Sequence, residues 1–107
     1  MLTKKQITEV KAGLGTNTAG FPLVFAALGD SRRFHIFRLL MKHHDICVTD
    51  VARVFGMSVS AASQQLRVLE RVGLVLKTRM GQMVCYEINQ ENIIAKQLVA
   101  LLKKSDK

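Results

Sequence analysis

Apolar and polar positions follow a helical period along most of the chain, and two stretches follow the period of strands. Apolar residues three or four apart predict helices over about residues 3–12, 22–28, 31–43, 50–55, 59–72 and 90–103. Short β-branched runs predict strands over 46–48, 74–78 and 83–88. A turn over residues 79–82 would join the last two strands as a hairpin. The pattern therefore predicts a mainly α chain with a small β-hairpin.

Capping residues and glycines mark the ends of these elements. Asp30, Thr49 and Ser58 each stand where a side chain can cap the helix that follows. Gly73 is placed to close a helix in the left-handed conformation. The glycine-rich and polar stretch 13–20 predicts a flexible connection after the first helix.

The segment from residue 48 to residue 69 has the pattern of a helix-turn-helix. Inward-facing residues of the two helices are small or apolar, and they are Val51, Ala52, Phe55, Ala62, Leu66 and Leu69. Gly56 permits the sharp turn between them. Gln65 adjoins Leu66, and we take Leu66 as the core position. The hairpin that follows is the wing of a winged helix-turn-helix.

The charge balance favours a polyanionic partner. Sixteen Lys and Arg residues face eight Asp and Glu residues, which gives a net charge of +8 and an isoelectric point near 10.0. Such a field attracts nucleic acid, and an anionic membrane surface is the rival interpretation. No apolar run is long enough to cross a bilayer, and the first ten residues lack the apolar core of a signal peptide. We expect a cytoplasmic protein without a membrane partner.

The second motif helix and the hairpin carry the side chains suited to DNA. Gln pairs with adenine, Arg with guanine, and Ser with bases or phosphate, and residues near the recognition-helix N-terminus enter the groove first. The candidate DNA contacts are Ser58, Ser60, Ala61, Ser63, Gln64, Arg67, Lys77, Arg79 and Gln82. The alternatives are a solvated polar face, architectural DNA binding without sequence preference, and a winged helix that binds protein.

Enzymatic activity is not expected. No Ser/His/Asp arrangement, glycine-rich phosphate loop or paired carboxylate set stands out in the sequence. Five basic residues against two acids between Ile46 and Tyr86 favour DNA over a protein partner.

Four segments together resemble the ArsR/SmtB family of bacterial and archaeal regulators. They are the stretch from Phe25 to Phe34, the run from Asp45 to Val51, the helix from Ser58 to Leu69, and the wing with Gly73-Leu-Val and residues 81–88. The resemblance implies a homodimer that binds a palindromic operator, usually as a repressor released by an inducer.

The resemblance also implies how the chain is divided. Residues 1–20 would form a dimerisation arm, 21–89 the winged helix-turn-helix core, and 90–107 a C-terminal dimerisation helix. The candidate residues for this helical dimer interface are Ile7, Val10, Ile94, Leu98 and Leu101. The alternative is that these residues belong to a plain intramolecular core.

Metal sensing is well known in this family, but the ligand sets are incomplete here. One family site uses a Cys-Val-Cys run, and this chain has Cys47-Val48-Thr49. Another takes Asp, His and Glu from the last helix, which here has Glu91 but neither Asp nor His before Asp106. His43 and His44 adjoin Asp45 and Cys47, so a metal site of a different kind is an alternative. No cofactor is certain, and a metal or metalloid inducer is an alternative.

The two cysteines suggest a thiol switch. In a winged helix the short strand before the motif pairs with the outer wing strand, which would bring Cys47 beside Cys85. Directly opposite residues have Cβ atoms about 4.5–5.5 Å apart, near the reach of a disulfide. Oxidation would then lock the wing to the motif and change DNA affinity. The alternative is that both cysteines are small strand residues without a sensory role.

Overall fold

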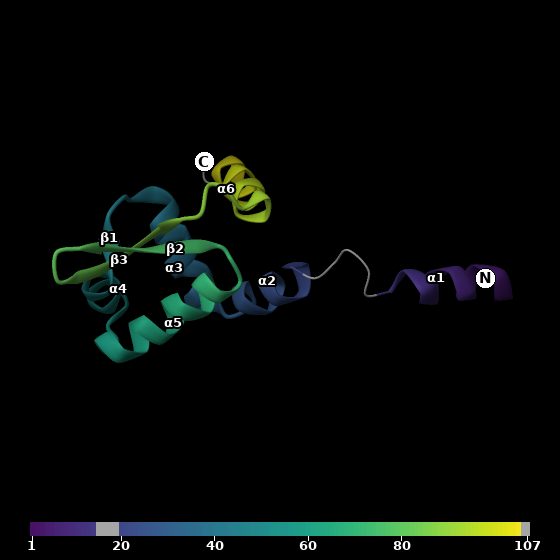
Figure 1. The fold of residues 1–107 in the computed structure, drawn as a ribbon, viewed down its shortest axis with the longest axis horizontal. Coiled ribbons are helices and arrows are strands. Elements are labelled where there is room, and N and C mark those ends of the chain that lie inside the picture. Colours follow the sequence, from purple (N-terminus) through teal and green to yellow (C-terminus); the bar gives the residue numbers. More distant parts are fainter. Residues whose placement is uncertain (15–19, 106–107) are drawn as a thin grey trace.

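Six helices and one three-stranded antiparallel sheet make up the computed structural model, which describes residues 1–14 and 20–105 (Figure 1). The helices are α1 (Lys4–Gly13), α2 (Gly20–Leu28), α3 (Ser31–Lys42), α4 (Val48–Phe55), α5 (Val59–Arg71) and α6 (Ile93–Ser105). The strands are β1 (Ile46–Cys47), β2 (Val75–Met80) and β3 (Met83–Ile88), arranged in the order β1-β3-β2. The predicted class, mainly α with a hairpin wing on a helix-turn-helix, is confirmed.

Two of the predicted caps are present as hydrogen bonds. The carboxylate of Asp30 accepts from the backbone amides of Arg32 and Arg33 at 2.9 and 3.1 Å. The hydroxyl of Ser58 accepts from the amide of Ala61 at 3.0 Å. Each bond satisfies an amide that the first helical turn leaves without a backbone partner. These contacts fix where α3 and the recognition helix α5 begin.

The start of the first motif helix was predicted wrongly. Helix α4 begins at Val48, two residues before the prediction, and its N-cap is Cys47 instead of Thr49. The physical reason is that Asp50 reaches back, so that its carboxylate accepts the amide of Cys47 at 2.8 Å. This is the return half of a capping box. The strand before the helix is correspondingly short.

The hairpin and the last helix also differ from their predicted bounds. Strand β3 has its predicted bounds, whereas β2 is shifted from the predicted 74–78 to Val75–Met80; Met80 pairs with Met83, so Gly81 and Gln82 alone form the turn. Helix α6 begins at Ile93 instead of residue 90, because the side chain of Asn92 accepts from the amide of Ala95 at 3.0 Å. Arg79 therefore lies within β2 and not in the turn.

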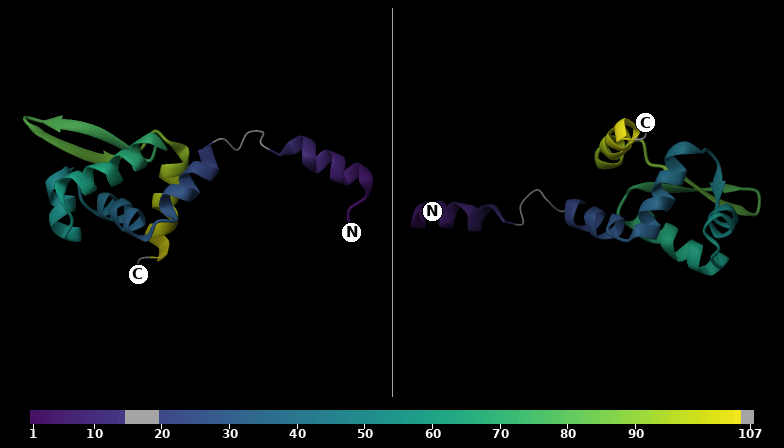
Figure 2. Two further views of the ribbon diagram at one scale, coloured as in Figure 1. Left: turned by 90° about the horizontal axis from the view of Figure 1, so that it is seen from below. Right: turned by 180° about the vertical axis from the view of Figure 1, so that it is seen from behind.

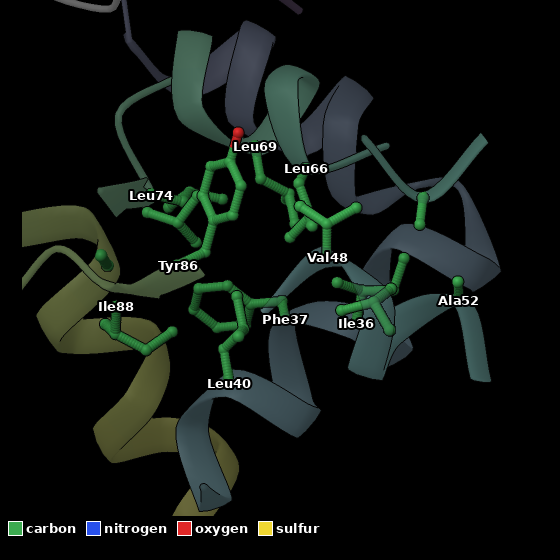
Figure 3. Packing of buried hydrophobic residues seen from close by; sticks show 14 of the residues in the cluster. Ile36, Phe37, Leu40, Val48, Ala52, Leu66, Leu69, Leu74, Tyr86 and Ile88 are labelled. Carbon is green, nitrogen blue, oxygen red and sulfur yellow. The ribbon is translucent and has the colours of Figure 1, made fainter. Parts of the chain in front are cut away.

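The core lies between α3, the two motif helices and the sheet (Figure 3). Phe37 of α3 sits at its centre, and Leu66 and Leu69 of α5 and Tyr86 of β3 pack around it. Ile36 is fully buried although the pattern did not place it on the inner face of α3. Burial of these apolar side chains holds the recognition helix α5 and the wing strand β3 against α3.

Helix α1 stands apart from the other elements, and each of its residues is exposed (Figures 1 and 2). The glycine-rich connection predicted after it falls on residues 15–19, outside the described residues. The proposed division at residues 20 and 89 stays a prediction. Among the described residues, none of the helices combines the length and the apolar character that a membrane span requires.

Candidate nucleic-acid interface

Helix α5 presents a buried face and an exposed polar face. Ala62, Leu66 and Leu69 have no solvent exposure, which anchors the helix on the core. Ser60 and Gln64 on the other side are exposed. Gly56 adopts φ +62° between α4 and α5, a left-handed conformation that L side chains rarely adopt. The turn thus sets the angle at which α5 leaves the motif with its polar face outward.

The wing extends away from the body of the protein as a two-stranded hairpin (Figure 2). Lys77 and Arg79 stand two residues apart on β2, so their side chains project from the same face. Both are exposed. Thr78 between them is half-buried, and its hydroxyl donates to the carbonyl of Cys85 at 3.4 Å. This arrangement aims two cations away from the sheet and towards α5.

A groove of about 430 Å³ separates the recognition helix from the wing. Its lining residues come from β1, α4, α5, both wing strands and the turn between them: Cys47, Val48, Thr49, Val59, Ser63, Arg67, Lys77, Arg79, Gln82, Met83, Val84 and Tyr86. The groove brings together five of the nine predicted DNA contacts, namely Ser63, Arg67, Lys77, Arg79 and Gln82. Val59, Thr49 and Met83 were missed, because only the folded chain places them opposite the basic residues.

The other four predicted contacts lie on α5 outside this groove. Ser60 and Gln64 are exposed and stay accessible to a ligand. Ala61 is half-buried and offers only a methyl group. The hydroxyl of Ser58 already accepts the cap bond described above, so one of its two lone pairs is occupied, and one lone pair and the O–H remain. The first turn of α5 therefore offers fewer free acceptors than the sequence suggested.

The groove is electropositive. Arg67 faces Lys77 and Arg79 across it, and its lining within the described residues contains no carboxylate. Burial, together with the nearby charge of Glu70, raises the pKa of the Tyr86 phenol, while Arg67 acts in the opposite direction. The phenol is therefore neutral at physiological pH and keeps its proton. A cationic groove with neutral donors suits the phosphates and base edges of a nucleic acid.

Cys47 and Cys85 are joined by a disulfide bond. They are directly opposite in the pairing of β1 with β3, as the strand alternation predicted. Cys85 is fully buried, and Cys47 is buried but contributes to the wall of the groove. The bond thus connects the N-terminus of α4 to the wing strand at the edge of the candidate interface. Whether the pair is sensory stays a prediction at this point.

The residues present do not fit a metal centre of the kind that the ArsR/SmtB resemblance suggested. Within residues 1–14 and 20–105, no three His, Cys, Asp or Glu side chains come together in a group that could hold a metal ion. Cys47, the one thiol in the expected Cys-Val-Cys position, is bonded to Cys85. The histidines at positions 43 and 44 are exposed at the end of α3.

A second groove of about 330 Å³ lies between α2 and α6 and is almost entirely apolar. It is lined by Phe21, Phe25, Ile93, Ile94, Gln97, Leu98 and Leu101. Phe25 and Leu101 are 65% and 61% exposed, which leaves a large apolar area open to water. The three predicted interface residues of α6 meet here, whereas Ile7 and Val10 lie on the separate helix α1.

Comparison with known proteins finds bacterial regulatory proteins that are similar to this chain. A model of the arsR family of bacterial regulatory proteins matches residues 30–77, which span α3 to β2. The CadC homolog of Staphylococcus aureus, a cadmium resistance transcriptional regulatory protein, is 37% identical over 76 residues. The match covers 71% of this chain but 61% of that protein, so the chain spans less than two thirds of this relative's length.

Two solved structures are similar to this chain in their fold. HlyU from Vibrio cholerae is similar with a TM-score of 0.74 and 27% identity, and the match covers 87% of this chain and 98% of that one. A homodimeric winged helix-turn-helix DNA-binding domain from Mycobacterium bovis, described as a possible ArsR-family transcriptional regulator, has a TM-score of 0.70 and 26% identity. That match covers 97% of this chain and 86% of the other.

Proposed function

Because the chain belongs to the arsR family of bacterial regulatory proteins, we propose that it is a sequence-specific, homodimeric transcriptional repressor. The observation that carries the proposal is the electropositive groove between α5 and the wing, with Arg67, Lys77 and Arg79 on its walls. The groove supplies phosphate contacts, and the exposed Gln64 beside it supplies base readout. Such a protein works on the chromosome, in the cytoplasm of a bacterium or an archaeon.

A second copy of this chain is the occupant proposed for the apolar groove between α2 and α6. The exposed aromatic and aliphatic side chains that line this groove are unfavourable in water. A symmetric dimer would bury them against the same side chains of the second copy. The homodimeric Mycobacterium bovis domain supports this arrangement by similarity. In the dimer, Ile7 and Val10 of α1 would add a further apolar stripe. Two-fold symmetry would then match a palindromic operator.

The function is tested by DNA binding at several salt concentrations. The wild-type protein selects duplexes from a random-sequence pool, and fluorescence anisotropy compares the best palindromic duplex with a random one. We expect a preference of about 10³-fold or more and a steep loss of affinity as salt rises. Equal affinity for both duplexes would leave only architectural binding, and no binding at all would favour a protein partner.

We further propose that thiol oxidation at Cys47 and Cys85 modulates this affinity. When the bond forms, the two thiols lose two protons and two electrons to a two-electron oxidant of the peroxide class, which is reduced to water or an alcohol and water; a reducing dithiol returns both thiols and is itself oxidised to a disulfide. The bond fixes the start of α4 to β3, and Cys47 lies on the groove wall, so forming it changes how freely the wing moves against α5.

The switch is tested on the same duplex with fully reduced and fully oxidised protein. We expect a large difference in affinity that disappears in Cys47→Ser and in Cys85→Ser. Cys47→Ser in the reduced state should bind like the reduced wild type, which controls for damage to the groove. Equal affinity in both redox states would demote the cysteines to structural residues.

A metal- or metalloid-responsive repressor is the second candidate. It is favoured by the neighbouring positions of Cys47 and Cys85, which in the reduced protein are two thiols side by side, and by the cadmium resistance role in the name of the CadC homolog. Adding Cd²⁺ or arsenite to the reduced protein on its selected duplex separates the two candidates. Release of DNA by either ion, but not by oxidation, would favour this candidate.

A further inference from the structure

The side chain of Arg33 connects three helices. Arg33 is half-buried although it carries a charge. Its Nε donates to the carbonyl oxygen of Ala27 at 2.8 Å, and its Nη1 donates to Oε1 of Gln65 at 3.1 Å. Nη1 also lies 3.7 Å from Oδ2 of Asp30. One guanidinium thus contacts the end of α2, the cap of α3 and the middle of α5.

Each of these contacts has a reason in local structure. Ala27 lies in the last turn of α2, where carbonyl groups have no partner within the helix. Gln65 adjoins the core residue Leu66 on α5, and its amide oxygen accepts a charge-assisted bond. The planar fork of arginine fixes the relative direction of both acceptors, which a lysine cannot do.

Apolar packing also brings α2 and α5 together. Val24 of α2 and Leu66 and Leu69 of α5 belong to one buried cluster. Apolar packing stabilises such a contact without dictating its direction, whereas hydrogen bonds weaken steeply when their geometry changes. The link from Ala27 through Arg33 to Gln65 is therefore the directional element among the described contacts between these helices.

We propose that Arg33 and Gln65 are positioning residues that set the orientation of the recognition helix α5 relative to α2. The inference rests on the proposed function, because α2 lines the groove assigned to the second copy and α5 carries the base-reading face. A dimer reads two half-sites at a fixed spacing of about 34–36 Å, so a small change in this angle misaligns both helices. Neither residue lines the DNA groove, so both act through α5.

Two conservative variants test the link. Gln65→Met keeps the length and the helix propensity of the side chain but removes the acceptor. Arg33→Lys keeps the charge near Asp30 but loses the fork. Gln90→Met is the matched control, because Gln90 is an exposed residue outside the helices. All are compared on the selected palindromic duplex and on random DNA, together with dimerisation and the thermal midpoint.

We expect each test variant to lose about tenfold in affinity for the selected duplex, because a charge-assisted contact is removed. Affinity for random DNA and dimerisation should stay at wild-type values, while the thermal midpoint falls by a few degrees because a hydrogen bond of the folded state is lost. The double variant should lose no more than either single variant, because both break the same link. Additive losses, or parallel losses on random DNA, would overturn the proposal.

A second measurement needs no DNA. Amide hydrogen exchange in the free protein should be faster in α5 of both test variants than in wild type, while exchange in α4 is unchanged. Unchanged exchange in α5 overturns the proposal. If the wild type shows no duplex preference, the proposed function fails, and the exchange measurement still decides whether Arg33 and Gln65 hold the helix.

Discussion

Cys47 and Cys85 are bonded to each other across the pairing of β1 with β3, although 38 residues separate them in the chain. The loop that the bond closes contains the whole helix-turn-helix and most of the wing. The covalent link therefore constrains the elements proposed to contact DNA and leaves α2 and α6 outside.

Reduction of this disulfide should lower the free energy of unfolding by about 4 kcal/mol. A cross-link that closes a loop of this length removes much of the conformational freedom of the unfolded chain. The measurement is urea denaturation with and without reductant. The free energy of unfolding of the double variant Cys47→Ser/Cys85→Ser should be the same with and without reductant. A wild type with the same stability in both conditions would contradict the expectation.

Gln64→Ala and Arg79→Ala should weaken DNA binding in different ways. Gln64 is exposed on α5, and losing a bidentate base contact costs about 1–3 kcal/mol on the selected duplex only. Arg79 lines the groove, and losing a phosphate contact should weaken all duplexes evenly and reduce the salt slope by about one. Anisotropy titrations over a salt series measure both effects.

The control for this pair is Arg71→Ala. Arg71 is exposed at the end of α5 and is not part of the groove lining. The variant Arg71→Ala removes the same charge as Arg79→Ala. An equal loss of DNA affinity in both variants would mean that net charge, and not the groove, governs affinity. An even loss on all duplexes for Gln64→Ala would remove that residue from base readout.

The features predicted correctly are those fixed by a few neighbouring residues. The caps at Asp30 and Ser58 and the turn at Gly56 depend on side chains within three positions. The strand pairing that joins Cys47 to Cys85 followed from the winged-helix order and from the alternation of side chains. Local features of this kind can be predicted from the sequence before any tertiary contact is known.

The features missed depend on contacts between distant segments. Arg33 is hydrophilic, and nothing within ten residues of it reveals that its guanidinium will donate a hydrogen bond to the amide oxygen of Gln65. The groove is missed as a unit for the same reason, since Val59 and Met83 meet only when the wing folds back towards α5. Thr49 failed as a cap because a second capping arrangement, through Asp50, competes for the same turn.

Gly73→Ala should destabilise the protein by about 1–3 kcal/mol, because it forces a strained backbone. Gly73 has φ +86°, and a Cβ there would lie 2.7 Å from Nδ2 of Asn92. The carbonyl of Gly73 also accepts from the side-chain Nδ2 of Asn89 at 3.1 Å, so a local shift would break that bond. Thermal unfolding followed by circular dichroism measures the change.

Gly13→Ala is the matched control. Gly13 lies in a helix and has no positive φ, and a Cβ there meets nothing within 4 Å. Alanine favours a helix over glycine, so this variant should be neutral or slightly stabilising. A loss of stability equal to that of Gly73→Ala would contradict the role assigned to the left-handed conformation.

Leu101→Glu should convert the proposed dimer to a monomer without unfolding it. Leu101 is 61% exposed in the single chain and lines the apolar groove, so a carboxylate there is tolerated in the monomer but not against a second copy. Analytical ultracentrifugation measures the mass. Leu76→Glu is the control, because Leu76 is 42% exposed on the wing and outside both grooves. A dimer that survives Leu101→Glu would place the interface elsewhere.

Asp30 should stabilise the protein in a pH-dependent way. The amide of Arg33 donates to its carboxylate, and this bond, with the charges of Arg33 and Arg32 and the amide of Arg32, lowers the pKa of Asp30, while burial opposes the shift. A carboxylate whose pKa is lower in the folded state contributes its full stabilisation above its unfolded pKa of about 3.9. That contribution is lost as the pH falls through the folded pKa.

The comparison with Asp30→Asn isolates this effect. Asparagine also caps helices well, so the variant keeps the cap and removes only the charge. We expect the thermal midpoint of the wild type to exceed that of Asp30→Asn at pH 6 and the difference to vanish as the pH is lowered below 4. Since the other carboxylates titrate in both proteins, the difference reports on Asp30 alone. A constant difference across this range would mean that the charge of Asp30, and its ion pair with Arg33, contributes nothing to the folded state.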